Sequence, residues 1–278
     1  MKKIIITVRK IIFLSLILSI SISAQAGLFQ KIKQMIDSVS TDNLINHIKI
    51  LEYAGGHKSR VTFTPGNDSA VVYIKNQFDK LEGLTNIEVD TFYISTAQSP
   101  YNTQPLVNII ATIEGKVYPE IIYIIGAHYD CSADKMPDWD TLWPTITAPG
   151  ADDNATGIAT LLEIARILAD TTFGFKNNYT IKLIAFGAEE KNVPDNKNPS
   201  HYGSIHYANN AKARNDIIYG VINLDMLGYN DNYDFQLIVS NSNSKLLSDW
   251  LVDVNNIFDI DLILQQLVSS TWTYSDHK

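Results

Sequence analysis

The sequence predicts an α/β fold with a single mixed, mostly parallel β-sheet sandwiched by helices. Two observations carry this prediction. After residue 121, short apolar runs rich in β-branched residues alternate with segments whose apolar residues recur at helical spacing. No internal repeat, low-complexity tract or linker interrupts this alternation. The 278 residues therefore predict one domain behind a distinct N-terminal segment.

The N-terminal segment has the pattern of a secretory signal peptide. Basic residues precede the apolar run Ile11–Ile22, and an A-x-A cleavage pattern ends at Ala26. The run is short for a bilayer span. We therefore interpret residues 1–26 as a signal peptide and residues 27–278 as the domain. This predicts a secreted or periplasmic protein without stable membrane association after signal cleavage.

The charge balance disfavours a nucleic-acid partner. Four of the 22 basic residues lie in residues 1–26, which leaves 18 basic against 30 acidic side chains and a formal charge of −12. Such acidity opposes binding to polyanions. Cys131 is the single cysteine, so no internal disulfide can form. We interpret it as a small buried residue without a catalytic role. The oligomeric state is not determined by these features.

The first half of the chain predicts helices followed by strands. Leu28–Ile50 predicts two short helices with a cap at Thr41-Asp42, and Pro65 begins a helix that Gly83 ends. The strands expected next are Ile87–Ile94, Pro105–Ile113 and Ile121–Ile125. Only a short turn at Tyr118-Pro119 separates the last two, which predicts that they pair as a hairpin.

The second half alternates between helices and strands. Residues 191–201 are polar and rich in Pro and Asn, which predicts an inserted loop. The elements expected are, in chain order, helix Thr156–Ala169, strand Tyr179–Phe186, helix Ser204–Ala213, strand Ile217–Leu224, strand Phe235–Val239 and helix Ser244–Phe258.

Potential metal ligands follow three of the predicted strands. Gly126 ends the run Ile121–Ile125, and the residues that follow these strands or open the next helix are His128 with Asp130, Asp153, Glu189 with Glu190, and Asp225. In open α/β sheets, ligands bind outside the carboxyl ends of the strands. Imidazole and carboxylate together form a zinc-type ligand set. The sequence therefore predicts a metal site at this edge.

A paired-metal site explains why several carboxylates are present. Two divalent cations ~3.5–4 Å apart can share one carboxylate, while a separate carboxylate takes the proton from the attacking water. Glu189 and Glu190 can divide these duties, because neighbouring residues on an extended segment point in opposite directions.

Four motifs occur in order: GAHYD, PGADDNATG, AFGAEE and NLDMLGY. Together with RVTFTPGNDSAVVYIKNQF, NIIATIEG and GSIHYA, they make the chain resemble the M28 family of zinc aminopeptidases from about Thr41 onward. The resemblance implies a zinc aminopeptidase, phosphorylase/hydrolase-like fold. It also implies an exported enzyme that hydrolyses N-terminal residues from peptides with a free N-terminus, through a metal-bound hydroxide.

The resemblance also assigns roles to single residues. It implies that two zinc ions are held by His128, Asp225, Glu190 and a bridging Asp153. In that scheme His128 and Asp225 hold one zinc and Glu190 holds the other. Glu189 is the implied general base, and Asp130 orients His128 from behind. A cis peptide is implied between Asp153 and Asn154.

The end of the sequence departs from the family pattern. The family's fifth ligand is a His beyond an S-D-H motif, whereas here Ser275-Asp276-His277 is followed only by Lys278. One zinc site therefore lacks its usual His, and a closing strand and helix are expected to be missing. His201, His206 and His277 are the candidates to replace the imidazole. The insert beside the Glu pair leaves the side-chain preference open.

Two alternatives to an active aminopeptidase remain. One is a truncated, inactive homologue that binds only peptide or metal. The other is a glutaminyl-cyclase-like enzyme, which uses a single zinc in similar-looking proteins. His128 speaks against the cyclase, because the ligand set for a second metal is retained.

Overall fold

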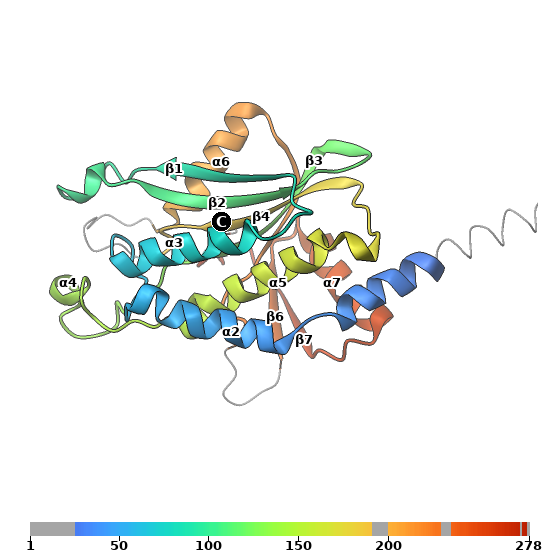
Figure 1. Cartoon of the computed structure of the whole chain (residues 1–278), viewed down its shortest axis with the longest axis horizontal. Coiled ribbons are helices and arrows are strands. Elements are labelled where there is room, and N and C mark those ends of the chain that lie inside the picture. Colours follow the sequence, from blue (N-terminus) through green and yellow to red (C-terminus); the bar gives the residue numbers. More distant parts are fainter. Residues whose placement is uncertain (1–25, 191–199, 229–234, 273, 277–278) are drawn as a thin grey trace, which may run out of the picture.

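The computed structural model describes residues 26–190, 200–228, 235–272 and 274–276 (Figure 1). Nearly all of the predicted signal peptide, most of the predicted inserted loop and His277 lie outside these residues. Among the described residues, no helix is long and apolar enough to cross a membrane.

The centre of the molecule is a five-stranded sheet with the order β1-β2-β4-β3-β5. β2 pairs antiparallel with β1 and β4, while β3 pairs parallel with β4 and β5. All strands except β2 therefore run in one direction, which confirms the mixed, mostly parallel sheet. The strands are β1 Asn86–Phe92, β2 Leu106–Ile113, β3 Tyr118–His128, β4 Tyr179–Phe186 and β5 Ile217–Asn223.

The predicted hairpin between β2 and β3 is wrong, because β4 lies between them. The backbone N–H groups after β2 explain the exchange. Those of Lys116 and Val117 donate to the carbonyl oxygens of Asn177 and Asn178, which lead into β4. The short turn therefore hydrogen-bonds to the segment before β4. It leads the chain past β4 into β3, two positions away from β2.

β3 is longer than the apolar run that predicted it. It begins at Tyr118 and continues through His128, which pairs with Phe186 of β4. Parallel neighbours on both sides bury this strand, so residues beyond the apolar run still take part in the ladder. His128 is therefore the last residue of the strand rather than part of the loop after it.

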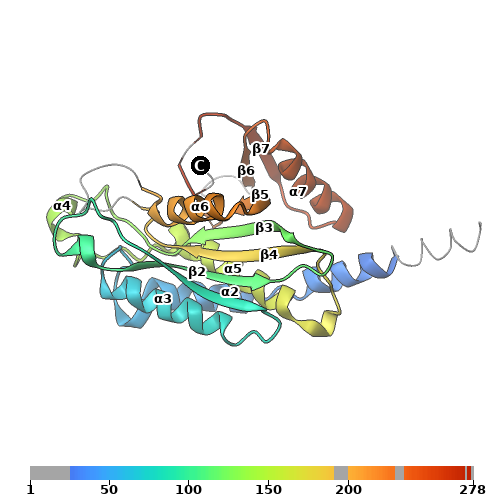
Figure 2. The same cartoon turned by 90° about the horizontal axis from the view of Figure 1, so that it is seen from above.

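Helices cover both faces of the sheet (Figure 2). On one face, Ile109 and Leu183 of the sheet pack with Leu161 of α5 and Ile74 of α3 in the main core. On the other face, Ile184 packs with Tyr207 of α6. The sandwich by helices is thereby confirmed. The helices are residues 26–37, α2 Thr41–Glu52, α3 Pro65–Phe78, α4 Trp139–Leu142, α5 Gly157–Ala169, α6 Tyr202–Arg214 and α7 Lys245–Phe258.

Several helix boundaries differ from the prediction, most clearly those of α2 and α3. Ser40, rather than Thr41-Asp42, caps α2, since its side chain accepts the N–H of Asn43. α3 ends at Phe78, before Gly83, and Phe78 itself is fully buried in the core.

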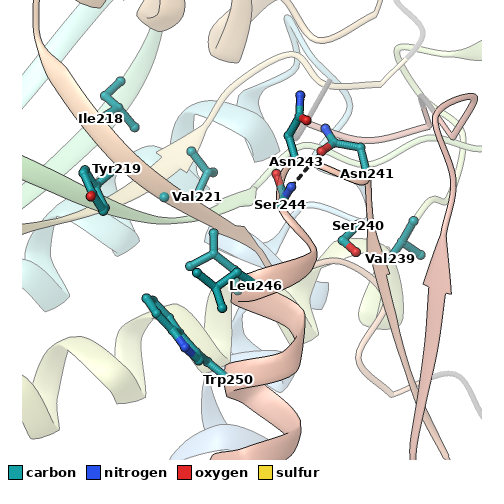
Figure 3. A pocket seen from close by; sticks show the side chains of 12 residues that line it. Ile218, Tyr219, Val221, Val239, Ser240, Asn241, Asn243, Ser244, Leu246 and Trp250 are labelled. Atoms are coloured by element: carbon teal, nitrogen blue, oxygen red, sulfur yellow. Dashed lines mark hydrogen bonds between the residues drawn. The ribbon is translucent and has the colours of Figure 1, made fainter.

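A second, two-stranded sheet lies apart from the first. β6 (Gln236–Ser240) and β7 (Leu264–Val268) pair in parallel and are connected through α7. The sequence did not predict β7, because its centre is Gln265-Gln266 and the strand is largely exposed. A groove of about 440 Å³ lies between β5 and the β6–α7 unit, and Trp250 and Leu246 face it from α7 (Figure 3).

Candidate metal centre

The predicted site residues come together at the carboxyl edge of the sheet. His128 ends β3, Glu189 and Glu190 follow β4, and Asp225 follows β5. Asp153 comes from the helical turn Ala151–Thr156 that precedes α5. These five side chains line one cleft of about 250 Å³. The sheet topology thus collects residues that lie almost one hundred positions apart in the sequence.

Three side chains form a compact cluster suited to one metal ion. His128 Nε2 lies 3.2 Å from Asp153 Oδ1 and 3.5 Å from Asp225 Oδ1. One potential ligand atom from each residue lies within 4.8 Å of the others. One imidazole nitrogen and two carboxylate oxygens match a zinc ligand set that leaves a position for water. The residues present therefore fit a zinc ion.

The charge around His128 is strongly negative. Burial alone would lower the pKa of its imidazole. The hydrogen bonds with Asp130, Asp153 and Asp225 outweigh burial and raise the pKa well above its ordinary value. A positive charge is therefore favoured at this point, and a divalent cation supplies one when it displaces the proton.

The two glutamates differ in their place in the cleft. Glu190 lines the cleft but does not belong to the three-residue cluster found among the described residues. Burial, with Asp153 next, raises the pKa of Glu190 well above its ordinary value. Glu189 is buried, with a side chain 9% exposed, and contacts His201. The division of duties between the two glutamates stays a prediction.

Asp130 connects the ends of β3 and β4. Its Oδ1 lies 3.5 Å from His128 Nδ1, and its carboxylate is fully buried. It also accepts the backbone N–H groups of Glu189 and Glu190. The sequence suggested only the contact with His128. The hydrogen bonds to the glutamates depend on β4 lying beside β3, which the sequence did not predict.

The turn that carries Asp153 is held by its neighbours. The peptide between Asp153 and Asn154 is cis, as the family resemblance implied. Asn154 donates to Leu224 O at 2.8 Å and accepts the N–H of Gly157 at 2.9 Å. The turn is thereby fixed to the end of β5, beside Asp225. This role of Asn154 was not predicted from the sequence, although its place directly after the predicted ligand Asp153 was a usable signal.

A buried arginine hydrogen-bonds to the segments that lead into Asp130 and Asp153. Arg60 is 1% exposed, and its guanidinium donates to the carbonyl oxygens of Tyr129, Pro149 and Gly150. Burial lowers its pKa from the ordinary value. Arg60 therefore holds together the segments before Asp130 and Asp153, a role that sequence reasoning missed.

The family model described as Peptidase family M28 matches residues 108–278, which include every candidate ligand. The chain belongs to peptidase family M28. Family membership confirms the resemblance drawn from the four motifs, and the matched residues contain the whole cluster at the sheet edge.

Curated relatives carry related names. A probable zinc metalloprotease of Pyrenophora teres f. teres (strain 0-1) is 27% identical over 205 residues, covering 71% of the chain and 39% of the relative. Leucine aminopeptidase 1 of Paracoccidioides brasiliensis (strain Pb03) is 26% identical over 201 residues, covering 72% and 46%. The glutaminyl-peptide cyclotransferase of Bos taurus is 31% identical over 151 residues, covering 52% and 39%. The chain thus spans less than half the length of these three relatives.

Solved structures share the fold. LapB from Legionella pneumophila has a TM-score of 0.64 at 23% identity, over 89% of this chain and 60% of that one. A glutaminyl cyclase of Macrostomum lignano has a TM-score of 0.67 at 18% identity, over 89% of this chain and 76% of that one. Both likenesses confirm the zinc aminopeptidase type of fold predicted for this M28 chain.

Three histidines of this M28 chain were candidates to replace the missing zinc ligand, and they differ in where they lie. His201 lines the cleft. His206 pairs with Asp90 at 3.1 Å and stacks on Phe92 instead, so it is not available to the cleft. His277 lies outside the described residues. In the same S-D-H motif, Ser275 donates from its hydroxyl to the carboxylate of Asp225.

Proposed function

We propose that the chain is an exported zinc-dependent aminopeptidase that hydrolyses N-terminal residues from peptides with a free N-terminus. The observation that carries the proposal is the cluster of His128, Asp153 and Asp225 in a cleft that also holds Glu189 and Glu190. Membership of peptidase family M28 supports it. Export, to the periplasm or the medium, is proposed on the pattern of residues 1–26 alone.

His128, Asp153 and Asp225 would hold one zinc ion, and Glu190 would hold a second that shares Asp153. Zinc supplies Lewis-acid polarisation of the scissile carbonyl and lowers the pKa of water. The carboxylates and the imidazole of the chain would hold these ions in the cleft at the carboxyl edge of the sheet.

Glu189 is proposed as the general base. Its carboxylate takes the proton from the attacking water and then delivers it to the leaving amine. The reaction needs this carboxylate to stay at a fixed place in the cleft. Asp130 supports that place, because it accepts the backbone N–H of Glu189 while it contacts His128.

The test is the substitution Glu189→Gln. We expect the wild-type chain, loaded with zinc, to release amino acids from the N-termini of a peptide panel. The variant should lose turnover by ~10²–10⁴-fold and bind as much zinc as the wild type by elemental analysis. Retained turnover in the variant would refute the mechanism. Peptide binding without hydrolysis by the wild type at saturating zinc would instead support an inactive homologue.

A second candidate is glutaminyl-cyclase chemistry. The similarity to the Bos taurus glutaminyl-peptide cyclotransferase favours it, since 31% identity is the highest among the three relatives described above. The same peptide panel should therefore include peptides with N-terminal Gln. Loss of ammonia from these peptides, seen by mass spectrometry without release of free amino acids, would select the cyclase.

A further inference from the structure

The side chain of His201 reaches the proposed general base. His201 Nε2 lies 2.9 Å from Glu189 Oε1, and the two side chains are only 8% and 9% exposed. A carboxylate has two oxygens that can accept hydrogen bonds. An imidazole nitrogen at ion-pair distance from one of them restricts the rotation of the carboxylate, so that the second oxygen keeps a defined direction.

The backbone holds His201 beside the loop after β4. The N–H of His201 donates to Glu189 O at 2.8 Å, and the N–H of Tyr202 donates to Ala188 O at 2.9 Å. These two bonds pair residues 201–202 with residues 188–189 and form a short hydrogen-bonded ribbon just before α6. His201 itself has a φ of 73°, in the left-handed region that non-glycine residues rarely adopt. The chain thus accepts an unfavourable backbone conformation at the residue that contacts Glu189.

Gly203 permits this close approach. A Cβ at Gly203 would lie 2.3 Å from Gly187 O and 2.4 Å from Asn108 Oδ1. Any larger residue would push the ribbon away from the end of β4. Backbone packing therefore sets the spacing between His201 and Glu189, and the contact does not depend on the rotamers of the two side chains alone.

A hydroxyl fixes the orientation of the imidazole ring. Ser200 Oγ lies 2.8 Å from His201 Nδ1, so Nε2 is the nitrogen turned toward Glu189. Burial opposes a positive charge on this ring, but the contact with Glu189 outweighs burial and raises the pKa of His201 above its ordinary value. Both ring nitrogens thus have a defined neighbour.

We propose that His201 is a positioning residue that holds the Glu189 carboxylate in its orientation toward the cleft. The inference rests on the proposed function, which makes Glu189 the general base. It differs from the role considered for His201 on sequence grounds, the replacement of a missing zinc ligand. The contact lies on Glu189, and His201 is outside the three-residue cluster found among the described residues.

Two substitutions of His201 distinguish a positioning role from a role in filling space. His201→Leu removes the donor and fills the space, whereas His201→Gln retains an amide donor near the position of Nε2. We expect His201→Leu to lower kcat by ~10–100-fold, the loss typical when a side chain that orients a metal-site residue is removed, with KM and zinc content unchanged. His201→Gln should recover most of that loss. His206→Gln, in the helix that begins directly after His201, is the matched control, and it should behave like the wild type.

Wild-type kcat in His201→Leu would overturn the proposal. An equal loss in both His201 variants would also overturn it, since the donor would then not be the feature that matters. A fall in zinc content in His201→Leu, with the zinc content of His206→Gln unchanged, would overturn it in favour of a ligand role.

A measurement without turnover tests the contact itself. In protein labelled with ¹⁵N-histidine, the substitution Glu189→Gln should shift the ring nitrogen signals of His201 and leave those of His206 in place. Unmoved His201 signals would overturn the proposal. If the wild-type chain shows no aminopeptidase turnover, the proposed function fails, and the nitrogen shifts alone decide whether His201 holds Glu189.

Discussion

The carboxylate of Asp130 accepts the backbone N–H of Glu189 at 3.0 Å. The same carboxylate accepts the N–H of Glu190 at 3.1 Å and the hydroxyl of Thr62 at 3.0 Å. One buried side chain after β3 therefore fixes the backbone of both glutamates after β4. The position of the glutamates relative to His128 depends on this link.

Replacing Asp130 with Ala should therefore weaken both the fold and the metal site. Three donors lose their buried acceptor, which we expect to cost ~1–3 kcal/mol of unfolding free energy. Zinc affinity should fall ~10–100-fold, as for other outer-shell partners. Urea denaturation and calorimetric zinc titration measure the two effects. The exposed Asp140 offers the control Asp140→Ala, and a variant of Asp130 with wild-type affinity would contradict this account.

Zinc should stabilise the folded chain. His128, Asp153 and Asp225 are brought together only by folding, so the ion binds the native state. Free zinc at 100 times the dissociation constant should then raise the unfolding free energy by ~2.7 kcal/mol. Thermal unfolding with and without a chelator measures the change. His128→Ala should remove the zinc dependence; if it persists in that variant, the ion binds elsewhere.

The stability of the chain should fall in acid through Glu163. Burial alone would raise the pKa of this carboxylate. Its bonds to Arg166, the Ser40 N–H and Asn43 outweigh burial and hold the pKa below its ordinary value. Its contribution is therefore present above the unfolded pKa of about 4.3 and is lost as the pH falls through the lower folded pKa.

The variant Glu163→Gln measures this contribution. At neutral pH it should be ~1–3 kcal/mol less stable than the wild type. The difference should shrink once the pH drops below the unfolded pKa of the carboxylate, when followed by urea denaturation across the pH range. A difference that stays constant into strong acid would show that packing, rather than charge, links α2 to α5 here.

Cys131 should resist alkylation in the folded chain. The thiol is 1% exposed and donates to Ala148 O, and burial raises its pKa to about 11. Since the thiolate is the reactive form, iodoacetamide at pH 8 should label the native protein far more slowly than the protein in urea. Mass spectrometry of the two samples gives the comparison, and equal rates would mean that the thiol is accessible.

The sequence predicted the elements whose patterns are local. Tyr179–Phe186 has the bounds expected from its apolar run, because a central buried strand needs little beyond that run. The hairpin of β2 and β3 failed for a non-local reason, namely that β4 takes the position next to β2. A short connection between two strands does not fix which strands become neighbours.

The candidate site also combines features that local sequence predicts with features that it does not. Motif order was enough to place His128, Asp153 and Asp225 together, whereas the supports of the site depend on contacts between distant segments. Arg60 bonds to carbonyls about 70 and 90 positions further along the chain. His201 and His206 lie close together in the sequence, and nothing in the local pattern distinguishes them. Only the path of the chain into α6 turns the first toward Glu189 and the second toward Asp90.

The outer edge of β5 has consequences for the protein in concentrated solution. Within the described part of the chain, this edge has no partner strand, and Tyr219 and Val221 are 65% and 40% exposed along it. An uncharged strand edge of this kind is a template for pairing between molecules. Self-association through β5 is therefore the expected behaviour as the protein is concentrated. Tyr219→Lys would place a charge on this edge, outside the residues that line the candidate metal site.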